Sequence, residues 1–178
     1  SYEDVEYGSG FEDEGNHLAL HGLYAADTFT AGVFVGNGTV FDDYDFDFYG
    51  AEGAFRFANW TLEGSATLRD QDNDYARYHV GAKYFFGDNF SVGGRYGFTD
   101  REGGDWNSYD IGAEYRLSAV PIVLTANYLQ FDGDFSWEVD TWSIGARWEF
   151  GSSSLREADR TAPIADIRNY LNDIRRWD

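Results

Sequence analysis

The sequence predicts an all-β fold whose antiparallel strands follow one another up and down. Three observations lead to this prediction: apolar and polar side chains alternate with period two, short breaks recur roughly every thirty residues, and longer acidic segments lie midway between those breaks. Period-two alternation is typical of strands because successive side chains of an extended chain leave opposite faces. An aromatic content of 19% and the presence of only 2 prolines also suit long strands.

The short breaks divide the chain into five hairpins that end near Phe150. They fall at Asp27 and at residues 58–59, 87–89 and 118–121. In chain order, the pattern predicts ten strands at residues 2–8, 17–26, 28–36, 49–57, 60–69, 77–86, 90–99, 108–117, 122–131 and 141–150. The first of these is short and acidic. Eight strands is the alternative if the first two are wrongly assigned.

Acidic residues gather at the ends of the hairpins opposite the short breaks. Of the 32 acidic residues, 17 lie in residues 11–16, 37–48, 69–77, 99–106 and 131–140. We expect these segments to be the long polar loops of an up-and-down meander, with tight turns at the other end.

The two faces of the strands differ in a way that predicts which face is inside. Along each strand, every second side chain is bulky and apolar, for example Val80, Tyr84, Phe98 and Trp142. The side chains between them, which have the other parity, mix glycine with charged residues. A barrel of about eight to ten strands has little room inside, so large aromatic side chains must face outward. An apolar outer band requires lipid, and closure leaves no strand edge in it. We therefore predict a closed antiparallel transmembrane β-barrel.

The charged parity supplies the candidate functional residues. These are the lumen-facing residues Glu52, Arg56, Glu63, Arg69, Arg77, Lys83, Arg95, Asp110, Glu114, Arg116, Arg147 and Glu149. Their opposite charges predict either a salt-bridged filling of the barrel or a polar pore whose charges select solutes.

Aromatic residues near the strand ends predict two interfacial girdles. Around the short turns lie Phe57, Trp60, Phe86, Phe90, Tyr115, Trp148 and Phe150. Near the acidic end lie Tyr75, Phe98, Trp106, Phe131, Phe135 and Trp137.

The chain changes character after Phe150, which predicts two regions: a barrel at residues 1–150, and a linker with an amphipathic helix at residues 151–178. Thr161 and Pro163 are typical of a helix start. An apolar stripe follows at helical spacing, formed by Ile164, Ile167, Leu171, Ile174 and Trp177. We expect this stripe to dock on a membrane, on the barrel, on a protein partner or on a neighbouring copy.

The strand TWSIGARWEF, which ends at Phe150, resembles the closing strand of bacterial outer-membrane β-barrels. The resemblance covers residues 1–150 and implies a location in the bacterial outer membrane, short turns and the helix in the periplasm, acidic loops outside, and a secretory signal that was removed. The inward charges also resemble those of small OmpA-like barrels, in which salt bridges fill the lumen. The 28 residues beyond Phe150 depart from the common pattern.

Composition limits the possible partners and chemistry. A net charge of -19 argues against nucleic-acid binding, and the absence of cysteine excludes thiolate metal sites. Asp70, Asp72 and Asp74 lack the glycine and glutamate of a calcium loop, so we predict no dedicated metal site and no cofactor. Loose binding of divalent cations, bridging the acidic loops to lipopolysaccharide, is expected instead.

The predicted function is a structural or narrow passive-channel role. Two alternatives stand beside it. A soluble β-barrel that binds a small apolar ligand would need no detergent to stay monodisperse. An outer-membrane hydrolase of the omptin type would use His17 or His21, but no serine or paired-aspartate motif accompanies these histidines, and we predict no catalysis.

Overall fold

The computed structural model describes residues 2–6, 12–40, 44–70, 75–101, 104–133 and 137–160. These residues form the strands β1 (Tyr2–Glu6), β2 (Glu12–Ala25), β3 (Phe29–Val40), β4 (Tyr44–Phe57), β5 (Trp60–Asp70), β6 (Tyr75–Phe85), β7 (Phe90–Arg101), β8 (Trp106–Arg116), β9 (Ile122–Gly133) and β10 (Trp137–Trp148), and the short helix α1 (Leu155–Ala158). The strands pair in chain order in one antiparallel sheet. The predicted all-β, up-and-down fold is therefore confirmed.

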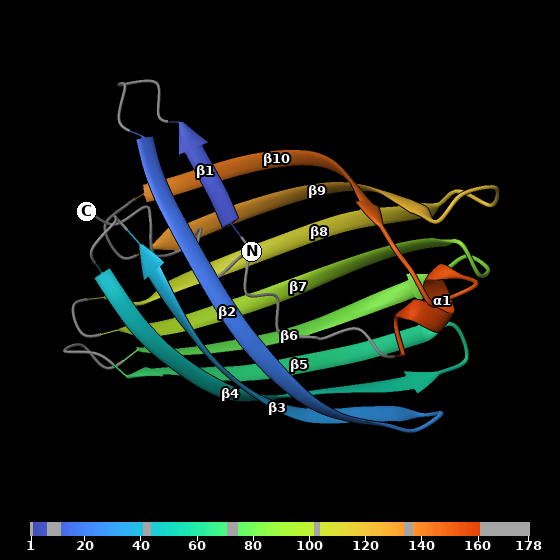
Figure 1. Cartoon of the computed structure of the whole chain (residues 1–178), viewed down its shortest axis with the longest axis horizontal. Helices are drawn as coiled ribbons and strands as arrows, with labels where there is room; N and C mark the ends of the chain where they lie inside the picture. The colour runs from blue at the N-terminus through green and yellow to red at the C-terminus, as the bar shows by residue number, and fades with distance from the viewer. Residues whose placement is uncertain are drawn as a thin grey trace.

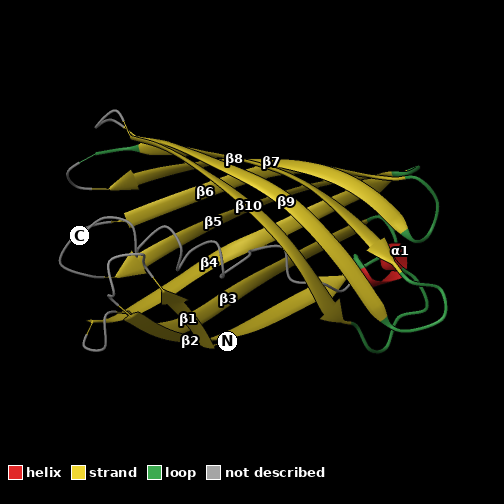
Figure 2. Ribbon diagram, turned by 90° about the horizontal axis from the view of Figure 1, so that it is seen from above, coloured by secondary structure: helices red, strands yellow, loops and turns green. Residues whose placement is uncertain are grey.

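The sheet curls round on itself, with α1 at the end where the short turns lie (Figures 1 and 2). From β2 to β10 each pair of neighbours is in register over at least ten residues, whereas β1 pairs with β2 over only five. Within the described strands no pairing joins β1 to β10. Among the described residues the sheet thus differs from the predicted closed barrel, because β1 is short, pairs only with the first residues of β2 and does not pair with β10.

The turn end matches the prediction closely. The strands on either side stop at the expected breaks, and the turn between β4 and β5 holds Ala58 at a positive φ of 48°. Six residues of the predicted girdle at this end are exposed, namely Phe57, Trp60, Phe86, Tyr115, Trp148 and Phe150, whereas the seventh, Phe90, is half-buried.

At the acidic end the strands are longer than predicted. Pairing continues through segments that were expected to be loops, for example from Asn37 opposite Asp47 to Val40 opposite Tyr44. Backbone hydrogen bonds between strands do not depend on apolar side chains. Two neighbouring strands therefore stay paired beyond the apolar part of the sheet, up to the turn that joins them. The expected long loops are therefore mostly strand.

The apolar parity faces outward, as predicted. Ile144 is 92% exposed and Trp142 is 78% exposed, whereas Arg77 on the opposite parity is only 2% exposed. We call the face that carries Arg77 the inner face. The sheet therefore buries its polar side chains and displays its apolar ones, the reverse of a soluble sheet.

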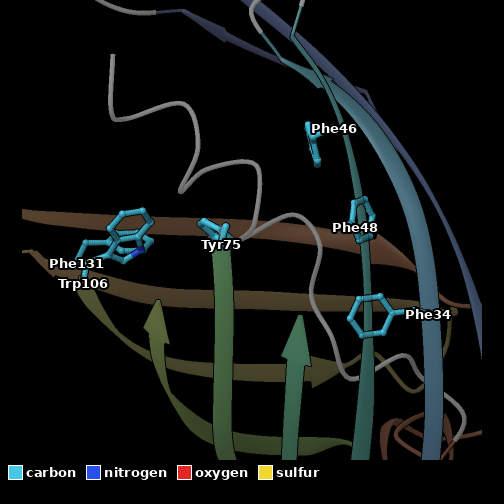
Figure 3. Packing of buried hydrophobic residues seen from close by; sticks show 6 residues of the cluster. All are labelled: Phe34, Phe46, Phe48, Tyr75, Trp106 and Phe131. Carbon is cyan, nitrogen blue, oxygen red and sulfur yellow. The ribbon is translucent and has the colours of Figure 1, made fainter. Parts of the chain in front are cut away.

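The predicted aromatic girdle at the acidic end is partly wrong. Tyr75, Trp106 and Phe131 are buried on the inner face, where they form an inner aromatic cluster with Phe34, Phe46 and Phe48 (Figure 3). They share the inner parity because Tyr75 is two residues from Arg77 and Trp106 is two from Ser108, both buried. Phe98 keeps the outer parity. Phe135 and the side chain of Trp137 lie outside the described part of the structure.

Candidate functional site

The structure places the predicted charged residues on the inner face. All twelve are buried or half-buried: Glu52, Arg56, Glu63, Arg69, Arg77, Lys83, Arg95, Asp110, Glu114, Arg116, Arg147 and Glu149. Their strands present them inward because each has the parity opposite to the exposed apolar residues.

A row of ion pairs crosses the inner face near the turn end. Nζ of Lys83 on β6 lies 3.7 Å from Oε2 of Glu114 on β8, and Glu114 accepts a hydrogen bond from Arg147 on β10. Arg147 also lies 3.0 Å from Glu149, whose other oxygen is 3.1 Å from Nη1 of Arg116. Charges of opposite sign therefore alternate along the row, which compensates for their removal from water.

Other predicted residues form separate pairs further from the turns. Nδ1 of His21 lies 2.7 Å from Oε1 of Glu52, and Nε of Arg95 lies 3.7 Å from Oδ1 of Asp110. The guanidinium of Arg69 lies 4.6 Å from the centre of the Phe46 ring, at the edge of the inner aromatic cluster. His21 therefore makes a polar contact with Glu52 on the inner face.

Three predicted groups receive no geometry from the structure. The side chain of His17, the residues Asp72 and Asp74, and the helix docking face of Ile164, Ile167, Leu171, Ile174 and Trp177 lie outside what the structure describes. Within the described residues, no group of three potential metal ligands lies together. No helix in the same part of the chain is long and apolar enough to cross a membrane.

The segment at residues 151–160, expected to begin a linker, instead returns to the inner face. Oδ2 of Asp159 accepts a hydrogen bond of 2.8 Å from Thr61, and Oδ1 accepts one of 2.9 Å from Lys83. Nε of Arg56 lies 3.5 Å from Oδ2, and Nη2 donates to the Asp159 carbonyl oxygen at 2.6 Å. The Asp159 carboxylate thus joins the row of ion pairs through Lys83.

The environment of Asp159 keeps its carboxylate ionised. Burial is the largest single influence and raises its pKa. The nearby charge of Lys83, the hydrogen bonds from Lys83 and Thr61, and the charge of Arg56 act in the opposite direction and together lower the pKa below its ordinary value. The site therefore binds the charged form of the carboxylate more strongly than the neutral form.

Further contacts fix the rest of the segment at the turn end. Leu155 is 2% exposed and packs with Phe85 and Val123 on the inner face. Arg156 donates to the carbonyl oxygen of Ala58 and to Oδ1 of Asn59. The Ser154 side chain caps α1 by accepting from the backbone N–H of Glu157. The segment therefore covers part of the turn end of the curled sheet.

Sequence reasoning missed Asp159, Thr61 and Leu155. One signal for Asp159 was present: the predicted inner set holds seven cationic and five anionic residues. A buried excess of positive charge needs an anion, and the segment after the last strand supplies it.

The chain is similar to a known protein family and to solved structures. The family model for Gram-negative porins matches residues 2–134 and, in a second overlapping match, residues 76–156. No curated protein matches the sequence. Among solved structures, the chain is similar to OmpT of Vibrio cholerae expressed in the outer membrane, with 14% identity and a TM-score of 0.52 over 82% of this chain and 62% of that one.

In-vitro folded OmpT of Vibrio cholerae, an outer-membrane protein, is also similar, with 14% identity and a TM-score of 0.45 over 77% of this chain and 63% of that one. The chain thus spans less than two thirds of the length of these structures. The first likeness supports the barrel fold, and the family match covers most of the chain. The chain belongs to the Gram-negative porin family of bacterial outer-membrane β-barrels.

Proposed function

We propose that the chain is a narrow passive channel that favours small anions. The observation that carries this proposal is the placement of buried, charged side chains on the inner face, opposite an exposed apolar face. Seven of the twelve predicted inward charges are cationic and five are anionic, and Asp159 adds a sixth anion. A positive excess of one remains, although the whole chain has a net charge of -19. Fixed charges that line a passage attract ions of the opposite sign and exclude those of the same sign.

The proposed passage is narrow for two reasons. A barrel of about ten strands has little space beyond that filled by its own side chains. The row of ion pairs and the segment at residues 151–160 occupy its turn end. Permeating solutes are therefore small, and the ion-pair row with the docked segment sets the barrier.

Planar-bilayer recording of the refolded protein tests this proposal. We expect discrete current steps, and a reversal potential in a potassium chloride gradient that indicates preference for chloride. Arg95→Gln removes one inward cation and should shift the reversal potential toward cation preference, whereas Asp110→Asn, which removes its anionic partner, should shift it the opposite way. Silence both in the full chain and after removal of residues 151–178 would refute the channel and favour a structural role.

The proposal also requires β1 and β10, which are not paired with each other in the described strands, to be joined in the membrane. Unpaired backbone N–H and C=O groups in hydrocarbon cost several kcal/mol each. The chain has no cysteine, so an engineered pair would cross-link without background. Cysteine at Val5, paired in turn with cysteine at positions 140–146 of β10, should give a disulfide at adjacent registers only if the two edges meet. Failure at every position would show that β1 does not close the barrel.

We further propose that the acidic end binds lipopolysaccharide through divalent cations. The support is electrostatic, since 17 of the 32 acidic residues lie in the segments at that end of the hairpins. Lipopolysaccharide binding should then require magnesium and be lost with a chelator. Docking of the stripe from Ile164 to Trp177 on a partner or a second copy stays a prediction from sequence.

A further inference from the structure

Three inward side chains on neighbouring strands form a row of donors at the turn end. Arg56 on β4 is directly opposite Thr61 on β5, and Thr61 is directly opposite Lys83 on β6. The three side chains share the inner face because partners in register point the same way. We call Arg56, Thr61 and Lys83 the donor row.

The donor row holds a single carboxylate group from both sides. Lys83 donates to one oxygen of Asp159 and Thr61 donates to the other. Arg56 adds a second positive charge, with its Nε 3.5 Å from the oxygen that Thr61 binds. A carboxylate that receives two cations and a hydroxyl donor has the partners that charge-assisted recognition requires. The donors belong to the sheet, whereas the carboxylate belongs to the segment that follows it.

The donor row is supported independently of Asp159. Nη1 of Arg56 also donates to Oγ1 of Thr30 at 2.8 Å, and Nζ of Lys83 also lies 3.7 Å from Glu114. These second contacts hold the two cations on the inner face. The row therefore stays suited to an anion when Asp159 is removed.

We propose that the donor row is a binding site for small carboxylate solutes and that Asp159 occupies it as an internal competitor. The role of this site in permeation rests on the proposed channel function, whereas binding itself does not. A solute carboxylate entering the passage replaces the Asp159 carboxylate on the same donors. The segment at residues 151–160 then both closes the turn end and limits how much of the donor row is occupied by solute carboxylates.

Replacement of Asp159 by alanine tests the site, with acetate as the probe. In detergent solution, sodium acetate should raise the thermal unfolding midpoint of Asp159→Ala above its value in sodium chloride of equal ionic strength. The wild-type chain should show a much smaller difference, because acetate must first displace the Asp159 carboxylate from the same donors. Asp159→Asn, which keeps the shape but not the charge, should gain a smaller response because its amide still occupies the row.

Matched variants assign the effect to the donor row. Glu157→Ala removes an exposed carboxylate of the same segment that contacts only Ser153 in the described contacts, and it should respond to acetate like the wild type. Adding Arg56→Gln to Asp159→Ala should weaken acetate binding several-fold, because it removes one of the two positive charges beside the carboxylate, and Arg56→Lys should restore part of it.

The outcomes separate the binding site from the channel. An equal response to acetate in the wild type, Glu157→Ala and Asp159→Ala would overturn the proposed site, as would no response in Asp159→Ala when circular dichroism shows that it is folded. Acetate binding without measurable current in any variant would keep the site and refute the channel. Current without acetate binding would keep the channel and refute the site.

Discussion

The ammonium nitrogen of Lys83 lies 2.9 Å from Oδ1 of Asp159 and so joins strand β6 to the segment after the last strand. The same nitrogen lies 3.7 Å from Oε2 of Glu114. One cation therefore serves both the docked segment and the row of ion pairs across the sheet. Removing it should affect both.

Lys83→Met should release the segment at residues 151–160. The change leaves the Asp159 carboxylate with Arg56 and Thr61 but without its second cation, at an expected cost to docking of about 1–3 kcal/mol. Trypsin cleavage after Arg156 and Arg160 of the folded protein should then be about 5-fold to 150-fold faster. Lys83→Arg keeps the charge and should stay close to the wild-type rate. An unchanged rate in Lys83→Met would show that the ion pair does not hold the segment.

Docking of the segment should be independent of pH near neutrality and weaken in acid. The pKa of Asp159 is lowered in the docked state from its ordinary value of 3.8, so the stabilisation is complete above that value and is lost as the pH falls through the lower, docked pKa. Around Asp159, the charged groups are Arg56 on β4, Glu63 on β5, Lys83 on β6 and Glu114 on β8.

Trypsin is inactive in strong acid, so fluorescence of a dye attached at Ser153→Cys follows the segment from pH 8 to pH 2. The signal should stay constant from pH 8 to about pH 5 and change below pH 4. The same dye on Asp159→Asn should show no such change in fluorescence, because that variant has no carboxylate at position 159 to protonate. A transition of the wild type between pH 5 and pH 8 would contradict the assignment to Asp159.

The faces of the strands could be predicted from sequence because parity is a local property. Val80 and Ile144 alternate with polar residues, and both are exposed. The predicted position of Tyr75, Trp106 and Phe131 was wrong because it followed from their aromatic character and not from their parity. In the structure the parity holds and the aromatic side chains fill the inner face at the acidic end.

Contacts between distant parts of the chain could not be predicted in the same way. Asp159 is 76 residues from Lys83 and 98 from Thr61, and no spacing rule links them. Closure of the sheet is equally non-local, because it depends on how β1 and β10 meet. Only the inward excess of positive charge indicated that an anion was missing.

Gly50→Ala should destabilise the inner aromatic cluster. A Cβ atom at Gly50 would lie 2.2 Å from the carbonyl oxygen of Ala66 and 2.4 Å from Cζ of Phe34, so backbone and ring must both move. Overpacking of this kind costs about 1–3 kcal/mol. Gly53→Ala on the same strand is the matched control, because its nearest atom would be 3.5 Å away. Urea unfolding of the vesicle-embedded protein measures both variants, and equal stability would argue against tight packing at Gly50.

Val80→Arg should prevent stable insertion into lipid. Val80 lies at the middle of β6, on the outer face, and is 61% exposed. At the midplane of a bilayer, arginine on the lipid-facing side of a barrel costs about 2–4 kcal/mol, whereas the same change on a water-exposed surface alters stability by only about 0.5 kcal/mol. The free energy of unfolding from vesicles should therefore fall by the larger amount, and Val80→Leu should leave it nearly unchanged. If Val80→Arg folds into vesicles as stably as the wild type, the outer face at this point does not contact hydrocarbon.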